Sequence, residues 1–95
     1  MKIYLTAILK PKKEKTQDLK PILDDMVLNT RKESACEKYE LQQSLDDETV
    51  FIFHEIWKNQ ESLNAHNQQP YIKNFAEKVP DLLEKPAEIY LTKLV

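Results

Sequence analysis

Residues 49–57 read Thr-Val-Phe-Ile-Phe-His-Glu-Ile-Trp, and this stretch has the strongest strand character in the sequence. Aromatic and β-branched residues dominate it, which is typical of a β-strand. Alternate side chains fall on two faces, with Phe51, Phe53, Glu55 and Trp57 on one and Val50, Ile52, His54 and Ile56 on the other. Both faces are largely apolar, whereas a strand with one solvated face would alternate apolar with polar residues. We therefore expect this strand to be covered on both sides.

Three further segments also have strand character. They are residues 2–10, 36–45 and 88–95. The first and the last again carry apolar residues on both faces, while residues 36–45 alternate weakly, with Tyr39 and Leu41 on one face. An acidic turn separates residues 36–45 from the central strand. These two strands are therefore predicted to form an antiparallel hairpin whose loop is longer than two residues.

A helix is predicted between the first two strands, because apolar residues recur there at spacings of three and four. We expect Thr16 to be its N-cap. Proline is tolerated only in the first turn of a helix, so Pro21 predicts either a start near Lys20 or a bend at the proline. The end of this helix is expected near Lys32.

A second helical region follows the central strand. Asn59 is its predicted N-cap, and a short helix then carries Leu63 and His66. Pro70 interrupts this helix and suits the first position of another. The apolar stripe of that second helix consists of Ile72, Phe75, Ala76 and Val79, and is extended beyond Pro80 by Leu82 and Leu83.

The predicted order of elements is strand, helix, strand, strand, helix pair and strand. This is the split β-α-β pattern of a ferredoxin-like α+β fold, with a four-stranded antiparallel sheet. Ninety-five residues are enough for one domain, so residues 1–95 are assigned to a single unit. The helices can cover only one face of such a sheet. We therefore expect a second copy of the chain to cover the other face, in a homodimer.

Composition excludes several classes of site. The chain contains no glycine, so it has no glycine-rich phosphate loop and no nucleophile elbow. One cysteine cannot form an internal disulfide, and with two histidines it is too few for a closed zinc site, so we expect no metal. A net charge of −2 argues against nucleic acid as a partner, and no apolar run is long enough to span a membrane. A reducing, cytoplasmic location is the resulting expectation.

His66 and Glu55 are the candidates for acid–base chemistry. An imidazole is suited to take up a proton near neutral pH, and a carboxyl between Phe53 and Trp57 is expected to be buried with a raised pKa or paired with a cation. A surface histidine and a structural ion pair are the alternatives. Trp57 and the four tyrosines could line a cavity or only pack in the core. Cys36 is expected to be a small buried residue.

Four short motifs follow one another through the middle of the chain. They are Cys36-Glu37-Lys38-Tyr39-Glu40-Leu41, Phe53-His54-Glu55-Ile56-Trp57, Leu63-Asn64-Ala65-His66 and Pro70-Tyr71-Ile72. Their order resembles the antibiotic biosynthesis monooxygenase family, which includes small quinol monooxygenases. The resemblance covers nearly the whole chain and implies a ferredoxin-like subunit that forms a dimeric α+β barrel with a buried cavity. It also implies oxidation of quinol-like or polyketide-like aromatic substrates by molecular oxygen, without metal or flavin.

The resemblance also assigns roles to individual residues. His66 matches the helix histidine of the family and would act as the base or proton shuttle. Glu55 would orient His66 or bind a substrate hydroxyl. The substrate-binding walls would be formed by Trp57, Tyr39, Tyr71 and Phe75.

Other members of the family leave alternatives open. Haem-degrading relatives need an asparagine on the first strand and a histidine on the last helix; Ala7 and Phe75 stand near these places, so haem degradation is not expected. Ser34-Ala35 stands where the family often has a glycine, and Tyr71 stands where it often has a histidine. The remaining alternatives are an isomerase or acid–base enzyme acting on a small phosphorylated sugar-like ligand, and a non-catalytic dimeric small-molecule-binding protein.

Overall fold

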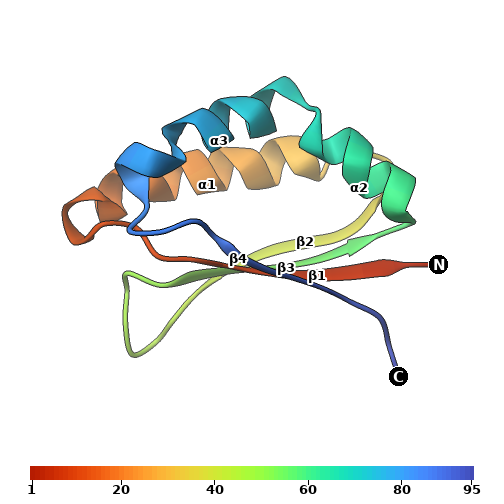
Figure 1. Ribbon diagram of the computed structural model, residues 1–95, viewed down its shortest axis with the longest axis horizontal. Coiled ribbons are helices and arrows are strands. Elements are labelled where there is room, and N and C mark those ends of the chain that lie inside the picture. The colour runs from red at the N-terminus through yellow and green to blue at the C-terminus, as the bar shows by residue number, and fades with distance from the viewer.

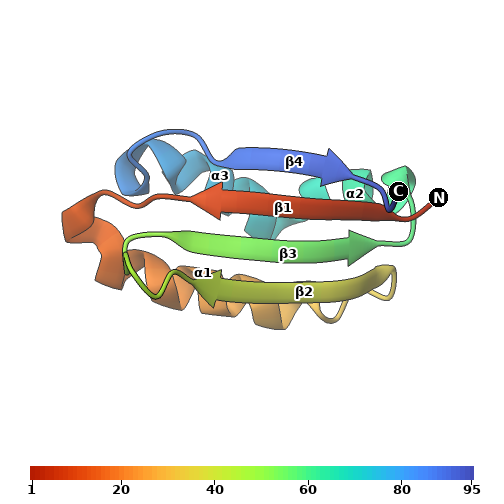
Figure 2. The same ribbon diagram turned by 90° about the horizontal axis from the view of Figure 1, so that it is seen from below.

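The computed structural model describes all 95 residues. Its strands are β1 (Ile3–Leu9), β2 (Cys36–Gln43), β3 (Phe51–Trp57) and β4 (Glu88–Thr92), and its helices are the 3-10 helix η1 (Lys13–Lys15), α1 (Thr16–Thr30), α2 (Gln60–Asn67) and α3 (Pro70–Leu82). The strands form one antiparallel sheet in the order β2-β3-β1-β4 (Figure 2). The helices form one layer over one face of this sheet (Figure 1). This is the ferredoxin-like α+β arrangement that the order of elements predicted.

The hydrophobic core lies between the sheet and the helix layer, and the two central strands supply most of it. Every second residue of β1 and β3 is buried, including Phe51, Phe53, Glu55 and Trp57 on β3. Leu19 and Leu23 of α1 pack on this surface and are completely buried. Because each fully buried large apolar side chain contributes about 1.5–3 kcal/mol, this layer accounts for most of the stability of the domain.

The face of the sheet away from the helices has an apolar centre and a polar rim. Its centre consists of half-buried side chains of β1 and β3, namely Tyr4, Thr6, Ile8, Ile52, His54 and Ile56. The residues beside them on the edge strands are Lys38, Glu40 and Gln42 of β2 and Glu88, Tyr90 and Thr92 of β4. No helix lies on this side of the sheet, toward which only the loop between β2 and β3 and the C-terminal tail project (Figure 1). The homodimer expected from this open face stays a prediction.

Helix α1 begins and ends earlier than predicted. It starts at Thr16, directly after η1, so Thr16 is the first helical residue and the cap position is occupied by Lys15. The 3-10 helix η1 is continuous with the start of α1, and no side chain caps the first turn of α1. The end lies at Thr30 and not near Lys32, because residues 31–35 form the turn that leads into β2.

Two prolines lie inside helices. Of the two alternatives stated for Pro21, a helix start near Lys20 is wrong, because α1 begins at Thr16 and runs through the proline. Pro21 lies in α1, and Pro80 lies in α3. Each removes one backbone N–H, which leaves the carbonyls of Gln17 and Ala76 without an intrahelical partner. Both prolines, as well as Gln17 and Ala76, are exposed, so water can hydrogen-bond to these carbonyls and both helices continue.

The hairpin between β2 and β3 has a long loop, as predicted, but β2 ends at Gln43 and not at residue 45. Ser44 and Asp47 organise this loop by accepting backbone hydrogen bonds: Ser44 Oγ accepts from the N–H of Asp46, and Asp47 Oδ1 accepts from that of Thr49. Between the strands and these loop bonds, one further backbone hydrogen bond of 2.9 Å joins the N–H of Ser44 to the carbonyl of Val50. The last strand, β4, likewise stops at Thr92.

The backbone has ordinary geometry throughout: no residue has a positive φ and no peptide bond is cis. None of the helices combines the length and the apolar character needed to cross a membrane.

Candidate functional site

A cavity of about 120 Å³ lies between the helix layer and the sheet. Eleven of its 14 lining residues are hydrophobic, and the other three are Glu55, His66 and Asn67. Glu55 and His66 are buried, whereas Asn67 and Ile89 are exposed. The cavity therefore opens between α2 and β4, with its two titratable side chains on the inner wall.

Helix α2 places His66 in the wall of this cavity. The helix is capped as predicted, since Asn59 Oδ1 accepts a hydrogen bond of 2.8 Å from the backbone N–H of Ser62. Leu63 and His66 lie one turn apart and therefore share the face that packs on the sheet. The imidazole is 4% exposed and packs on the indole of Trp57, with ring centroids 4.5 Å apart. His66 is thus a buried cavity residue and not a surface histidine.

Glu55 reaches the same cavity from β3. It is 6% exposed and forms no salt bridge, so the structural ion pair considered from the sequence is absent. Its Oε1 accepts a hydrogen bond of 2.8 Å from Trp57 Nε1. Burial raises the pKa of Glu55 to about 7; the Trp57 hydrogen bond opposes this shift, and the nearby Glu33 carboxylate adds to it. A carboxyl with this pKa can be protonated or ionised near neutral pH.

Tyr39 and Phe75 form part of the cavity wall. Tyr39 is buried on β2, with its ring centroid 5.0 Å from that of Phe53 and 5.8 Å from that of His66. Burial raises the pKa of the Tyr39 hydroxyl far above its ordinary value, so this phenol stays protonated. Phe75 contributes from α3, and only part of its side chain is buried.

Trp57 and Tyr71 were also expected at the cavity, but the structure places both behind its wall. Trp57 is completely buried beneath His66 and Glu55 and touches both. Tyr71 is not among the residues that line the cavity, and its hydroxyl donates a hydrogen bond to Glu33 Oε2. Burial, together with this carboxylate, raises the pKa of Tyr71 to about 12. Both residues support the cavity without lining it.

Glu33 is the residue that the sequence analysis missed. It lies in the turn between α1 and β2, and its Oε2 is 2.7 Å from Nδ1 of His66. The carboxylate in contact with the histidine is therefore Glu33, and no hydrogen bond joins His66 to Glu55, which had been considered for that role. Its place in the run Arg31-Lys32-Glu33 is typical of a solvated turn, so no local pattern pointed to it.

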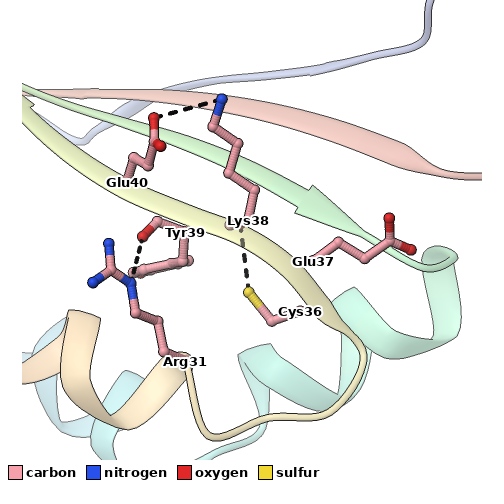
Figure 3. A pocket seen from close by; sticks show the side chains of 6 residues that line it. All are labelled: Arg31, Cys36, Glu37, Lys38, Tyr39 and Glu40. Carbon is pink, nitrogen blue, oxygen red and sulfur yellow. Dashed lines mark hydrogen bonds and ion pairs between the residues drawn. The ribbon is translucent and has the colours of Figure 1, made fainter.

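A second, shallow pocket lies at the outer edge of β2 and differs in character from the cavity (Figure 3). Arg31 reaches from the end of α1 and donates a hydrogen bond of 3.1 Å from Nε to the backbone carbonyl of Tyr39. Lys38 and Glu40 pair with each other at 3.5 Å on the other side of the strand. Charged groups of both signs at the strand edge protect it from pairing with another chain.

Cys36 is the only thiol of the chain, and it does not lie in a reactive environment. The Cys36 thiol is half-buried, donates a hydrogen bond of 3.4 Å to the carbonyl of Lys38, and has its pKa raised to about 11, mainly by burial. A thiol with this pKa is a poor nucleophile at neutral pH. No group of three or more His, Cys, Asp or Glu side chains is arranged to hold a metal ion.

Comparison with known proteins yields a consistent set of relatives. The chain is 34% identical to the protein sll1783 of Synechocystis over 92 residues, which are 97% of this chain and 63% of that longer protein. It is 28% identical to the Bacillus subtilis protein named "Putative monooxygenase YcnE", over 97% of both chains. In fold it matches the structure of Rv0793 from Mycobacterium tuberculosis with a TM-score of 0.93 and 24% identity, covering 100% of this chain and 96% of that one.

A family model matches most of the sequence and identifies the family of this chain. Residues 2–78 match the model of the antibiotic biosynthesis monooxygenase family. This range contains β1 to β3, α1 and α2, and with them Glu55, His66 and Glu33. The ferredoxin-like architecture and the similarity to the relatives above agree with this match. The chain therefore belongs to the antibiotic biosynthesis monooxygenase family.

Proposed function

We propose that this protein is a monooxygenase that oxidises a small, single-ring, quinol-like compound with molecular oxygen and uses neither metal nor flavin. The observation that carries the proposal is the pair Glu55 and His66 in the wall of an otherwise apolar cavity. Family membership supports the same type of reaction. Two groups able to exchange protons in a water-poor space are what activation of a phenol requires.

His66 acts as the base in this reaction. The phenolic O–H bond breaks and its proton passes to the imidazole, which makes the ring anion electron-rich enough to reduce O₂. One oxygen atom then enters the ring and the other leaves as water. The substrate supplies all four electrons, since a quinol that gains one oxygen and loses two hydrogens becomes a hydroxyquinone.

Glu55 binds the second hydroxyl of the substrate. Its Oε1 is engaged by Trp57, and its other oxygen has no partner within the protein. Because the pKa of this carboxyl is about 7, it can accept or donate a hydrogen bond to a ring hydroxyl near neutral pH. Tyr39 and Phe75 form aromatic walls, while Trp57 and Tyr71 hold the two acid–base groups in place.

Cavity size favours a single-ring substrate over a polyketide of several rings. An apolar cavity of about 150 Å³ holds one benzene molecule. The cavity described here measures about 120 Å³, so one ring fits only if the side chains at the entrance, Asn67 and Ile89, move slightly. A three-ring anthrone would need the helix layer to move.

The alternative of a phosphorylated sugar-like ligand has little support. A phosphate group needs cationic side chains or free backbone N–H groups. None of the 14 residues lining the cavity is lysine or arginine. Most of that lining is hydrophobic, which suits an aromatic ring and not a sugar.

We further propose that two copies of the chain pack through the open faces of their sheets. The apolar centre and polar rim of this face match the usual arrangement of a protein interface. A symmetric dimer would bury Ile8, Ile52 and Ile56 of both copies. It would also stiffen β1 and β3, the strands that form the floor of the cavity.

Oxygen uptake by the purified, chelator-treated protein tests the function. We expect turnover of methyl- or methoxy-substituted hydroquinones, with one O₂ consumed per substrate and one atom of ¹⁸O incorporated from ¹⁸O₂. Uptake by substrate and buffer alone is subtracted. A requirement for added iron or flavin would exclude the cofactor-free reaction, and faster turnover of anthrone than of any single-ring quinol would contradict the assigned substrate size.

A further inference from the structure

Three elements bring polar side chains together behind the wall of the cavity. Glu33 comes from the turn after α1, His66 from α2 and Tyr71 from α3. Oε2 of Glu33 lies 2.7 Å from His66 Nδ1 and also accepts a hydrogen bond from the Tyr71 hydroxyl. The oxygen of Tyr71 lies 3.1 Å from Thr30 Oγ1. Since Tyr71 already donates its proton to Glu33, Thr30 must be the donor in that last bond.

These contacts determine which nitrogen of His66 carries the proton. An ionised carboxylate only accepts hydrogen bonds, so the imidazole must present an N–H to Glu33 at Nδ1. The neutral ring then keeps its lone pair on Nε2. No buried side-chain nitrogen or oxygen in this protein lacks a hydrogen-bond partner, and Nε2 of His66 makes no hydrogen bond. Nε2 must therefore retain accessible surface, which the cavity provides because His66 lines it.

We infer that Glu33 is a positioning residue: it holds His66 as the Nδ1–H tautomer with the basic Nε2 directed into the cavity, and Tyr71 and Thr30 hold Glu33. The meaning of this arrangement for catalysis rests on the proposed function. When a substrate O–H bond breaks, its proton is bound at Nε2 and the ring becomes an imidazolium. Its positive charge then lies beside the carboxylate of Glu33, so the pair is neutral overall and the protonated state is stabilised.

The location of Glu33 supports this role over a purely structural one. Its side chain is 17% exposed, so the carboxylate keeps partial contact with water. It does not line the cavity and cannot touch a substrate bound there. Glu55, which does line the cavity, accepts a hydrogen bond from Trp57 and forms none with His66. The tautomer of His66 is therefore set by Glu33.

Nitrogen-15 NMR of histidine-labelled protein tests the tautomer directly. We expect His66 of the wild-type protein to show the Nδ1–H pattern, while His54, on the other face of the sheet, serves as the internal reference. Glu33→Ala should convert His66 to a mixture of tautomers, because Nδ1 loses its acceptor. A wild-type His66 with its proton on Nε2 would overturn the inference even if every variant failed to fold.

Steady-state kinetics then test the role in the reaction. Glu33→Gln preserves the size of the side chain but removes its charge, so kcat should fall about 10–100-fold with little change in KM. Tyr71→Phe should retain the Nδ1–H tautomer and lower kcat less. The matched control is Glu37→Gln, which removes another carboxylate near the same turn, one that pairs with Lys2 at 2.7 Å. It should change neither the tautomer nor kcat.

The two measurements separate failure of this inference from failure of the proposed function. A wild-type protein that has the Nδ1–H tautomer but oxidises no quinol refutes the monooxygenase assignment and leaves the positioning by Glu33 supported. An active enzyme whose kcat is unchanged by Glu33→Gln refutes the positioning role and leaves the monooxygenase assignment in place.

Discussion

The two faces of β1 and β3 are similar in sequence pattern but differ in what covers them. On the helix side, Glu55 lies among buried aromatic residues and has its pKa raised to about 7. On the open side, His54 lies among half-buried isoleucines and no helix packs over it (Figure 2). Alternation along a strand therefore specifies two apolar faces but not which of them forms a functional site. A titratable group becomes a candidate for chemistry only where another layer encloses it and leaves a cavity.

The largest expected effect is on the enclosed face, at His66. Replacing it with alanine should lower turnover of the preferred quinol about 10²–10⁴-fold, because the base is lost. Unfolding free energy should also fall, by about 2 kcal/mol, since a buried ring is removed and Glu33 loses a donor. Asn64→Ala, an exposed change two positions away on α2, is the control. Wild-type turnover in the His66→Ala variant would remove this residue from the mechanism.

The next effect concerns the open face, where Ile52→Asp would place a charge in the proposed dimer interface. An unpaired buried charge costs about 3–5 kcal/mol, so even one of the two charges in a symmetric dimer should weaken association about 10²–10⁴-fold. Light scattering at micromolar concentration should show a dimer for the wild-type protein and a monomer of 11.2 kDa for the variant. Gln42→Asp, at the polar rim beside Ile52, provides the control. A wild-type monomer would refute the interface.

Glu55 is expected to make the unfolding free energy depend on pH, and this effect is smaller than the two above. Its folded pKa of about 7 lies above the ordinary value of 4.5, so the folded state holds the proton more tightly. The resulting stabilisation is complete below about pH 4.5 and is lost as the pH rises through about 7, a change of about 3 kcal/mol. Glu55→Gln has no such proton, so its stability relative to the wild-type protein should rise across this range. Urea unfolding at pH 5 and pH 8 measures this difference, and equal shifts at both values would contradict the raised pKa.

The smallest effect belongs to the shallow pocket at the edge of β2. Lys38→Ala breaks an exposed pair with Glu40, and such pairs contribute about 0–1 kcal/mol. We expect no change in turnover and a change in unfolding free energy below about 0.5 kcal/mol. A large loss of activity in this variant would relocate the functional site from the cavity to the strand edge.

The parts of the molecule that follow a regular pattern could be predicted from the sequence. The faces of β3, the N-cap at Asn59 and the joint placement of Leu63 and His66 depend on periodicity or on a local hydrogen bond, and all agree with the structure. The pairing of Trp57 with Glu55 joins two residues on the same face of one strand. Local geometry is sufficient for features of this kind.

The features that failed depend on contacts between distant segments. Glu33 meets His66 across 33 positions, and the packing of both α1 and α2 against α3 brings the two segments together. Tyr71 donates a hydrogen bond to the same carboxylate and does not line the cavity. The start of α1 was misplaced for a different reason, since the cost of Pro21 depends on whether the freed carbonyl is exposed to water, which periodicity does not reveal.

No residue has a positive φ, so no position of this backbone requires glycine, and this affects the unfolded chain as well as the folded one. Average usage of about 7% would give a chain of this length roughly six or seven glycines, and this chain has none. Where the backbone allows it, replacing glycine by a residue with a side chain lowers the conformational-entropy cost of folding by about 0.4–1 kcal/mol. A denatured ensemble with fewer accessible states thus offsets the small core of an 11.2-kDa domain. Part of the stability of this protein therefore comes from the conformations that its unfolded chain cannot adopt.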